Sequence, residues 1–273
     1  MNTQYLAVST GTLAYDDQGA GPLVLCVPSM GDVRREYRFL APLLVGAGYR
    51  VVTMDVRGHG ESSVKWPDYS VAGVGADMLA LIRYLNAGPA LLVGTSMAAG
   101  ASVWAAAEAP ELVAGMVLIG PFVRDMGPLW PGRLLFSVLF ANPWGRAAWM
   151  WYFSTLYPTR KPADWLEYTA RLRRNLKEPG RMQALRSMIM ASKRASGERL
   201  ERVQAPALVV MGTRDPDFKQ PAQEAQLVGM ALHAPVHMIE GAGHYPHAEM
   251  PEQVAPVVIA FFQQVQEPVS HGS

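Results

Sequence analysis

Ser96 lies at the junction between an apolar stretch and a run of small residues, in the segment LLVGTSMAAGASVW (residues 91–104). A serine hydroxyl becomes a good nucleophile only when a base removes its proton, and the oxyanion that then forms needs N–H donors directed at it. A tight turn from a strand into a helix meets both needs, because it raises the hydroxyl above the sheet and points the first helical N–H groups at one spot. Such a turn requires a small residue two positions before and after the serine, and Gly94 and Ala98 stand there. The segment therefore predicts a nucleophilic serine, with a helix N-cap as the alternative role for Ser96.

A general base and an acid that orients it follow later in the chain. His244 comes after two glycines in GAGHYPHAEM, a loop from which an imidazole can reach over the edge of a sheet. Asp215 directly follows the apolar run ALVVMGT, and ligands bind at the carboxyl ends of strands in an open α/β sheet. The order serine, aspartate, histidine is one of the chain orders in which this catalytic triad occurs. With His244 as the base, activity is predicted to fall as the pH drops through about 6 to 7.

Three nearby residues compete for these roles. His247 lies three positions after His244, Asp217 lies two positions after Asp215 in the same turn, and Asp125 follows the apolar run at residues 115–122. The glycine before His244 opens its loop, and Asp215 is closer to the end of its strand than Asp217 is. His244 and Asp215 are accordingly the predicted pair.

Short apolar runs alternate with helical patterns along most of the chain, which is typical of a parallel sheet covered by helices on both faces. Between about residues 123 and 203 this alternation stops and five of the seven tryptophans appear, which indicates a helical insertion between two strands. The predicted strands are residues 22–28, 50–56, 90–95, 115–122, 205–213 and 235–241, and the helical patterns include residues 36–49, 71–86, 96–110 and 253–266.

The sequence resembles the lid-bearing α/β-hydrolases, in the branch that contains esterases, C–C hydrolases and epoxide-hydrolase-like enzymes. The matching segments are DVRGHGES (55–62), GTSMA (94–98), MGTRDPD (211–217) and EGAGHYPHAEMPEQV (240–254). The resemblance implies a mostly parallel eight-stranded sheet with helices on both faces, divided into a core at residues 1–122 and 203–273 and a helical lid at 123–202. It also implies that Ser96 is the nucleophile, Asp215 the acid, His244 the base and the Met97 N–H one oxyanion donor.

The loop after the first apolar run departs from that family's pattern. The family usually has His-Gly followed by the residue that gives the second oxyanion N–H, whereas this chain has Val27-Pro28-Ser29-Met30-Gly31. Position for position, Ser29 becomes the second donor through its amide, and its hydroxyl is an alternative. Pro28 fixes its own φ near −65°, so the backbone of this loop can differ from that of the family.

A lid over a serine site has an inner face, and its aromatic residues predict an apolar pocket for an acyl or aromatic group. We therefore predict a serine hydrolase that cleaves a small to medium apolar carboxylic ester. A C–C hydrolase, an acyltransferase and a receptor-like protein with slow hydrolysis would carry the same triad and remain alternatives. The residues predicted to line the pocket are Trp130, Trp144, Trp149, Trp151 and Phe153.

Composition and motifs favour a small-molecule substrate and no nucleic-acid partner. The formal net charge of +1 gives no global field that would attract nucleic acid. No metal-ligand motif and no glycine-rich dinucleotide motif is present, so we expect no metal and no other cofactor. The chain has one cysteine, Cys26, no apolar run long enough for a membrane span and no secretory pattern at its start, which favours a cytoplasmic location. The residues from about 267 onward are predicted to be a disordered tail, and the oligomeric state is left open.

Overall fold

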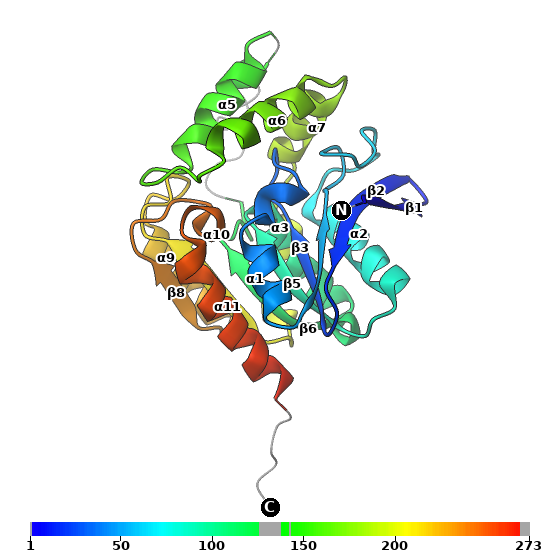
Figure 1. Ribbon diagram of the computed structural model, residues 1–273, viewed down its shortest axis with the longest axis vertical. Coiled ribbons are helices and arrows are strands. Elements are labelled where there is room, and N and C mark those ends of the chain that lie inside the picture. The colour runs from blue at the N-terminus through cyan, green and yellow to red at the C-terminus, as the bar shows by residue number, and fades with distance from the viewer. Residues whose placement is uncertain (1, 126–137, 142, 268–273) are drawn as a thin grey trace, which may run out of the picture.

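The structure is a computed structural model, and it describes residues 2–125, 138–141 and 143–267 (Figure 1). One eight-stranded sheet, in the order β1-β2-β4-β3-β5-β6-β7-β8, forms its centre. Neighbouring strands from β4 onward in this order are parallel, whereas β2 is antiparallel to both β1 and β4. The mostly parallel α/β sheet confirms the predicted fold class. The strands are β1 Gln4–Val8, β2 Gly11–Gln18, β3 Leu23–Val27, β4 Arg50–Met54, β5 Ala90–Thr95, β6 Val113–Ile119, β7 Ala207–Gly212 and β8 Val236–Ile239.

The six strands expected from the apolar runs are β3 to β8. Strands β3, β5 and β7 are buried at every position, as expected for strands covered on both faces. The hairpin of β1 and β2 lacks a long apolar run, because most of its residues are exposed or half-buried. The alternation of apolar runs and helices therefore did not reveal these two strands.

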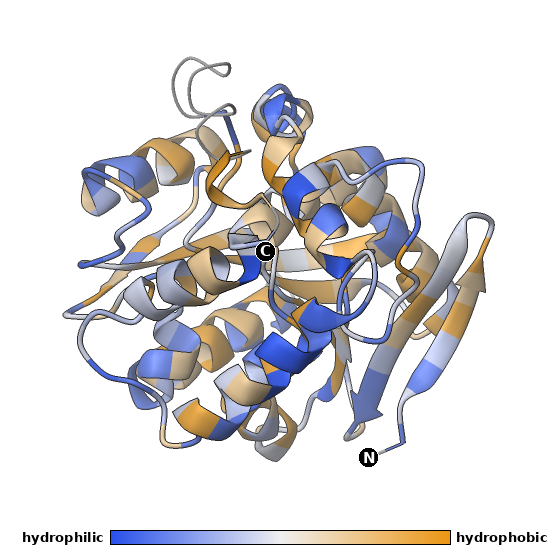
Figure 2. Ribbon diagram, turned by 90° about the horizontal axis from the view of Figure 1, so that it is seen from above, coloured by the Kyte–Doolittle hydropathy of each residue, from blue (hydrophilic) through white to orange (hydrophobic). Residues whose placement is uncertain are grey.

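Helices cover both faces of the sheet. On one face, α1 (Leu40–Gly46) packs against α11 (Pro251–Gln266), and Figure 1 shows both in front of the strands. On the other face lie α2 (Val71–Leu85), α3 (Met97–Glu108) and α9 (Pro221–Leu232). Each face has its own apolar cluster, and the hydrophobic strands run between helices of mixed character when the molecule is seen from above (Figure 2). Each face of the sheet is therefore buried by its own set of helices.

The helices between β6 and β7 form a separate layer, which we call the helical insertion. It contains α5 (Gly145–Thr155), α6 (Trp165–Lys177), α7 (Arg181–Met190) and α8 (Arg194–Gly197), all within the predicted range 123–202. Figure 1 shows α5, α6 and α7 above one end of the sheet. Aromatic side chains of α5 and α6 pack on one another and on Tyr245, which follows His244. The insertion is thus attached to the core at the end of the sheet where strands β5, β6 and β7 finish.

The remaining short elements connect these layers. They are the 3-10 helices η1 (Arg34–Tyr37), η2 (Pro110–Leu112) and η3 (Leu200–Arg202), and the helix α10 (Pro246–Glu249). None of the helices in the described part of the chain combines the length and the apolar composition that a membrane crossing requires.

Candidate active site

Ser96 occupies a strained turn between β5 and α3. Its φ of 59° and ψ of −119° lie outside the regions that residues other than glycine usually adopt. Such a conformation costs about 1–3 kcal/mol and is concentrated at functional sites. The side chain of Ser96 forms no capping hydrogen bond with α3, which counts against a purely capping role. A Cβ added at Gly94 would lie 2.6 Å from the carbonyl oxygen of Ala98, so the close approach of strand and helix explains the glycine.

Asp215 and His244 meet beside this turn. Nδ1 of His244 lies 2.7 Å from Oδ2 of Asp215, and both side chains are buried. The backbone brings them together, since the Arg214 N–H donates to the carbonyl of Ala242 at 2.9 Å, and the His244 N–H donates to the carbonyl of Leu156 in the helical insertion at 2.9 Å. Gly120, at the end of β6, leaves room for the pair, because a Cβ there would lie 2.9 Å from Nδ1 of His244. Sequence reasoning did not single out Gly120, and its position directly after a strand was the available signal.

The other two candidates face elsewhere. His247 is fully buried beneath the site, stacked on Tyr37 with ring centroids 4.9 Å apart, and its Nε2 lies 3.1 Å from Oε1 of Glu36. Asp125 accepts hydrogen bonds from the Ser192 hydroxyl and from the Lys193 amide, so it organises the loop before α8. Neither is in contact with the Asp215–His244 pair in this structure.

Asp217 lies on the opposite side of the imidazole from Asp215. Its Oδ2 is 3.6 Å from Nε2 of His244, and its Oδ1 accepts a hydrogen bond from the Tyr152 hydroxyl of α5. The Asp217 N–H donates to Oδ1 of Asp215 at 3.0 Å, which fixes the two carboxylates relative to each other. Two positions apart in one turn, Asp215 and Asp217 therefore flank the two nitrogens of one histidine.

This arrangement shifts the basicity of His244. Burial by itself lowers the pKa of His244, but the carboxylates of Asp215 and Asp217 outweigh it and raise that pKa to about 9. The neutral imidazole, which is the form that can accept a proton, dominates only above this pKa. We therefore expect kcat/KM to rise with pH between about 7 and 9, and not between 6 and 7 as the unperturbed histidine predicts.

The measurement is kcat/KM for an ester across pH 5 to 10, with the Ser96→Ala protein as the blank for spontaneous hydrolysis at each pH. A rate that reaches its plateau below pH 7 would show that His244 is not held protonated by its two carboxylate neighbours.

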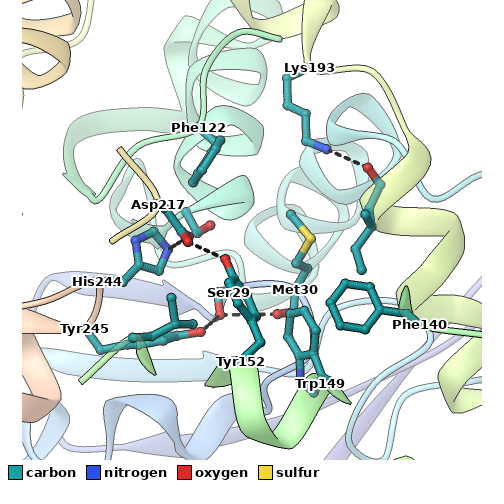
Figure 3. A pocket seen from close by; sticks show the side chains of 13 residues that line it. Ser29, Met30, Phe122, Phe140, Trp149, Tyr152, Lys193, Asp217, His244 and Tyr245 are labelled. Carbon is teal, nitrogen blue, oxygen red and sulfur yellow. Dashed lines mark hydrogen bonds and ion pairs between the residues drawn. The ribbon is translucent and has the colours of Figure 1, made fainter. Parts of the chain in front are cut away.

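The oxyanion donors differ from those expected. The Met97 N–H belongs to the first turn of α3, where amides have no intrahelical acceptor, and so it can serve an oxyanion. The Ser29 N–H instead donates to Oε2 of the buried Glu36 at 2.8 Å. In this structure the Ser29 amide is therefore engaged by Glu36, because a buried carboxylate needs hydrogen-bond donors. The Ser29 hydroxyl, which is hydrogen-bonded to the Tyr245 hydroxyl, faces the cavity instead (Figure 3).

A cavity of about 140 Å³ connects these groups. Both Ser96 and His244 line it, although no hydrogen bond joins their side chains among the described residues. Catalytic hydrogen bonds are often long in the absence of substrate. Most of the wall is apolar, and about half of it comes from the helical insertion (Figure 3). The lining residues are Ser29, Met30, Ser96, Phe122, Phe140, Trp149, Tyr152, Leu156, Ile189, Lys193, Asp217, His244 and Tyr245.

Of the five aromatic residues predicted to line the pocket, the structure places only Trp149 there. Trp144 and Trp151 are 53% and 66% exposed, so the prediction for them is wrong. Phe153 is fully buried but packs against Trp165 and Tyr245 within the insertion. Trp130 lies outside the described residues. Helix α5 is aromatic on several sides, and only packing selects the face that carries Trp149 and Tyr152.

Two carboxylates and one imidazole also form a potential metal-binding group. The possible ligand atoms of Asp215, Asp217 and His244 all lie within 4.8 Å of one another. The 2.7 Å bond between Asp215 and His244 already orients the ring, as an acid–base pair requires. In these positions Asp215 can orient the ring of His244, and Asp217 lies beside its other nitrogen.

Comparison with known proteins agrees with the fold described above. A family model described as the alpha/beta hydrolase fold matches residues 22–251. The chain belongs to the α/β-hydrolase fold family. The matched residues include strands β3 to β8, and Ser96, Asp215 and His244 lie within the same range.

Individual relatives of this α/β-hydrolase have different activities. The chain is 30% identical to a 2-(acetamidomethylene)succinate hydrolase of Mesorhizobium japonicum, over 88% of each chain. It is 37% identical over 108 residues to a protein of Mycobacterium tuberculosis named as a non-heme bromoperoxidase, BpoC, but that match spans only 41% of BpoC. A thermophilic esterase from Thermogutta terrifontis superimposes with a TM-score of 0.80, at 23% identity, over 96% of this chain and 99% of the esterase. The last similarity shows the fold alone.

Proposed function

We propose that this α/β-hydrolase is a serine esterase that cleaves small to medium apolar carboxylic esters through an acyl-enzyme on Ser96. The observation that carries the proposal is the buried Asp215–His244 pair, joined at 2.7 Å, in the same cavity as a serine held in a strained turn. A nucleophile, a base and an orienting acid are the three parts that acyl transfer to serine requires.

The first half of the reaction forms the acyl-enzyme. Neutral His244 takes the Ser96 proton at Nε2 while Oγ attacks the ester carbonyl, and Asp215 stabilises the resulting imidazolium. The Met97 amide and the Ser29 hydroxyl donate to the oxyanion of the tetrahedral intermediate. The imidazolium then gives its proton to the departing alkoxide, so that the C–O bond to the alcohol breaks and the Ser96 ester remains.

The second half returns the enzyme to its starting state. His244 removes a proton from a water molecule, the hydroxide adds to the acyl carbon, and the protonated ring returns the proton to Ser96 Oγ as the acid leaves. The helical insertion acts as the lid in this proposal, since Trp149, Tyr152 and Leu156 wall the cavity and separate these steps from bulk water.

The hydrolase named in Mesorhizobium japonicum supports a hydrolytic reaction, and the apolar cavity wall supports an apolar acyl group. A C–C hydrolase, an acyltransferase or a receptor would retain the same triad, and only turnover of substrates separates them. We keep a cytoplasmic location as part of the proposal, since one buried cysteine is ordinary in a reducing compartment.

The test is the intact mass of the protein after incubation with a fluorophosphonate, which reacts with activated serines. We expect one adduct per chain that is lost in the Ser96→Ala variant, and hydrolysis of p-nitrophenyl esters of short to medium chain length. An unlabelled wild-type protein that hydrolyses no ester of the series would contradict the proposed function.

A further inference from the structure

Asp217 is a carboxylate inside a cavity whose wall is mostly apolar. Among the thirteen described residues that line the cavity, it is the only acidic one, and its side chain is just 10% exposed. A buried charge is expensive unless a cation or hydrogen-bond donors accompany it. In the described part of the chain, Oδ1 has the Tyr152 hydroxyl, whereas Oδ2 has only Nε2 of His244, at 3.6 Å, which is beyond hydrogen-bond distance. Oδ2 therefore has protonated His244 as its counter-ion but, among the described residues, no hydrogen-bond donor.

The position of Oδ2 relates it to one part of the substrate. In the proposed reaction, Nε2 of His244 gives its proton to the oxygen of the departing alcohol, so that oxygen must come within about 3 Å of Nε2. A group two or three bonds further along the alcohol then lies beside Asp217. The acyl group lies on the other side of the bond that breaks, so it is not the part of the substrate that the proton from Nε2 reaches.

The surroundings of Asp217 suit a cation. The rings of Phe122, Trp149 and Tyr152 line the same cavity, and aromatic faces attract cations over distances up to about 6 Å. Besides His244, the wall has one more basic side chain, Lys193, which donates through Nζ to the carbonyl of Ala191 at 2.8 Å and extends toward that of Ile189, at the end of α7 (Figure 3). Its ammonium is thus bound to the end of a helix and is not the partner of Asp217.

We propose that Asp217, held by Tyr152 in a cavity lined by aromatic rings, is the binding site for an ammonium group carried by the alcohol part of the substrate. This inference rests on the proposed esterase function and names the class of ester: an apolar acyl group joined to a small amino alcohol. The step itself is unchanged, and the amino alcohol leaves with the proton from His244.

The same contact links binding to reactivity. Without a cation, burial raises the pKa of Asp217, and its charge in turn helps to keep His244 protonated. The groups that face the imidazole are Asp215, Asp217, Tyr245 and, further below, Glu36. An ammonium beside Asp217 replaces the His244 proton as its counter-ion, which favours the neutral imidazole that acts as the base. The cationic substrate therefore activates its own general base.

A matched pair of esters tests this proposal. 2-(Dimethylamino)ethyl acetate is protonated at pH 7, and 3-methylbutyl acetate has the same shape with carbon in place of nitrogen. We expect kcat/KM for the amino ester to exceed that of its isostere by roughly tenfold or more in the wild-type protein. We also expect the acid limb of kcat to lie at a lower pH for the amino ester, a shift that a purely structural role of Asp217 would not cause.

The variants Asp217→Asn and Asp125→Asn provide the comparison. Both remove one negative charge, but Asp125 does not line the cavity. The ratio between the two esters, which is independent of the overall activity of each variant, should fall to about one in Asp217→Asn and remain in Asp125→Asn. A wild-type ratio near one, a ratio that survives in Asp217→Asn, or hydrolysis of p-nitrophenyl acetate without the amino ester would each overturn this inference and leave the esterase function standing. Hydrolysis of none of these esters would instead contradict the proposed function itself.

Discussion

Replacing Ser96 with alanine should lower kcat for ester hydrolysis by roughly 10⁵- to 10⁶-fold, because no other group then forms the acyl-enzyme. The residual rate should come from the oxyanion donors and from substrate binding alone. The measurement is single-turnover hydrolysis of a p-nitrophenyl ester at pH 9, where the neutral form of His244 is present. Alanine and serine adopt the same positive φ of 59° in this turn, so the substitution should add no backbone strain.

A control on the same helix separates a chemical effect from a structural one. Ser102 is buried in α3, and its hydroxyl donates to the carbonyl of Ala98 at 2.9 Å, away from the cavity. The Ser102→Ala variant should keep the activity of the wild-type protein, and the circular dichroism spectra of both variants should match that of the wild type. An Ser96→Ala protein that still hydrolyses esters would exclude Ser96 as the nucleophile.

The Ser29→Ala variant should lose about 10²- to 10³-fold in kcat, the usual cost of removing one oxyanion donor. The prediction depends on which group of Ser29 does the work. Its amide donates to the buried Glu36, and alanine retains that amide. Only the hydroxyl, which is hydrogen-bonded to that of Tyr245, is lost in the variant.

The Ser29→Thr variant is the matched comparison, because it keeps both the hydroxyl and the amide. We expect it to retain most of the activity, with KM changing more than kcat if the added methyl group crowds the cavity. Full activity in Ser29→Ala would mean that the amide leaves Glu36 when substrate binds and serves the oxyanion as the family pattern implies.

Local sequence was sufficient where a structural feature depends on neighbouring residues. Apolar runs predicted the six strands β3 to β8, and the small residues Gly94 and Ala98 predicted the turn at Ser96. The same reasoning left out β1 and β2, whose burial pattern carries no apolar run. A continuous apolar run indicates a strand that is buried on both faces, and a half-exposed hairpin has no such run.

The choice between neighbouring candidates needed three-dimensional packing. Asp215 and Asp217 are two positions apart, and only the turn that joins their backbone and side chain directs one to Nδ1 and the other toward Nε2 of His244. His247 lies only three positions after His244 in the chain, yet its side chain contacts Glu36 and not the catalytic candidates.

The cavity wall most clearly separates what local sequence predicts from what tertiary packing decides. The sequence by itself determined that a parallel α/β sheet presents a serine, an aspartate and a histidine in that order, because strand ends and turns are encoded by residues close together in the chain. The tertiary structure alone decided that Trp149 faces the cavity while Trp151 faces solvent, and that Glu36 binds the amide of Ser29. These outcomes depend on how segments distant in sequence pack, and a helix with aromatic residues on several sides does not reveal which side the core will cover.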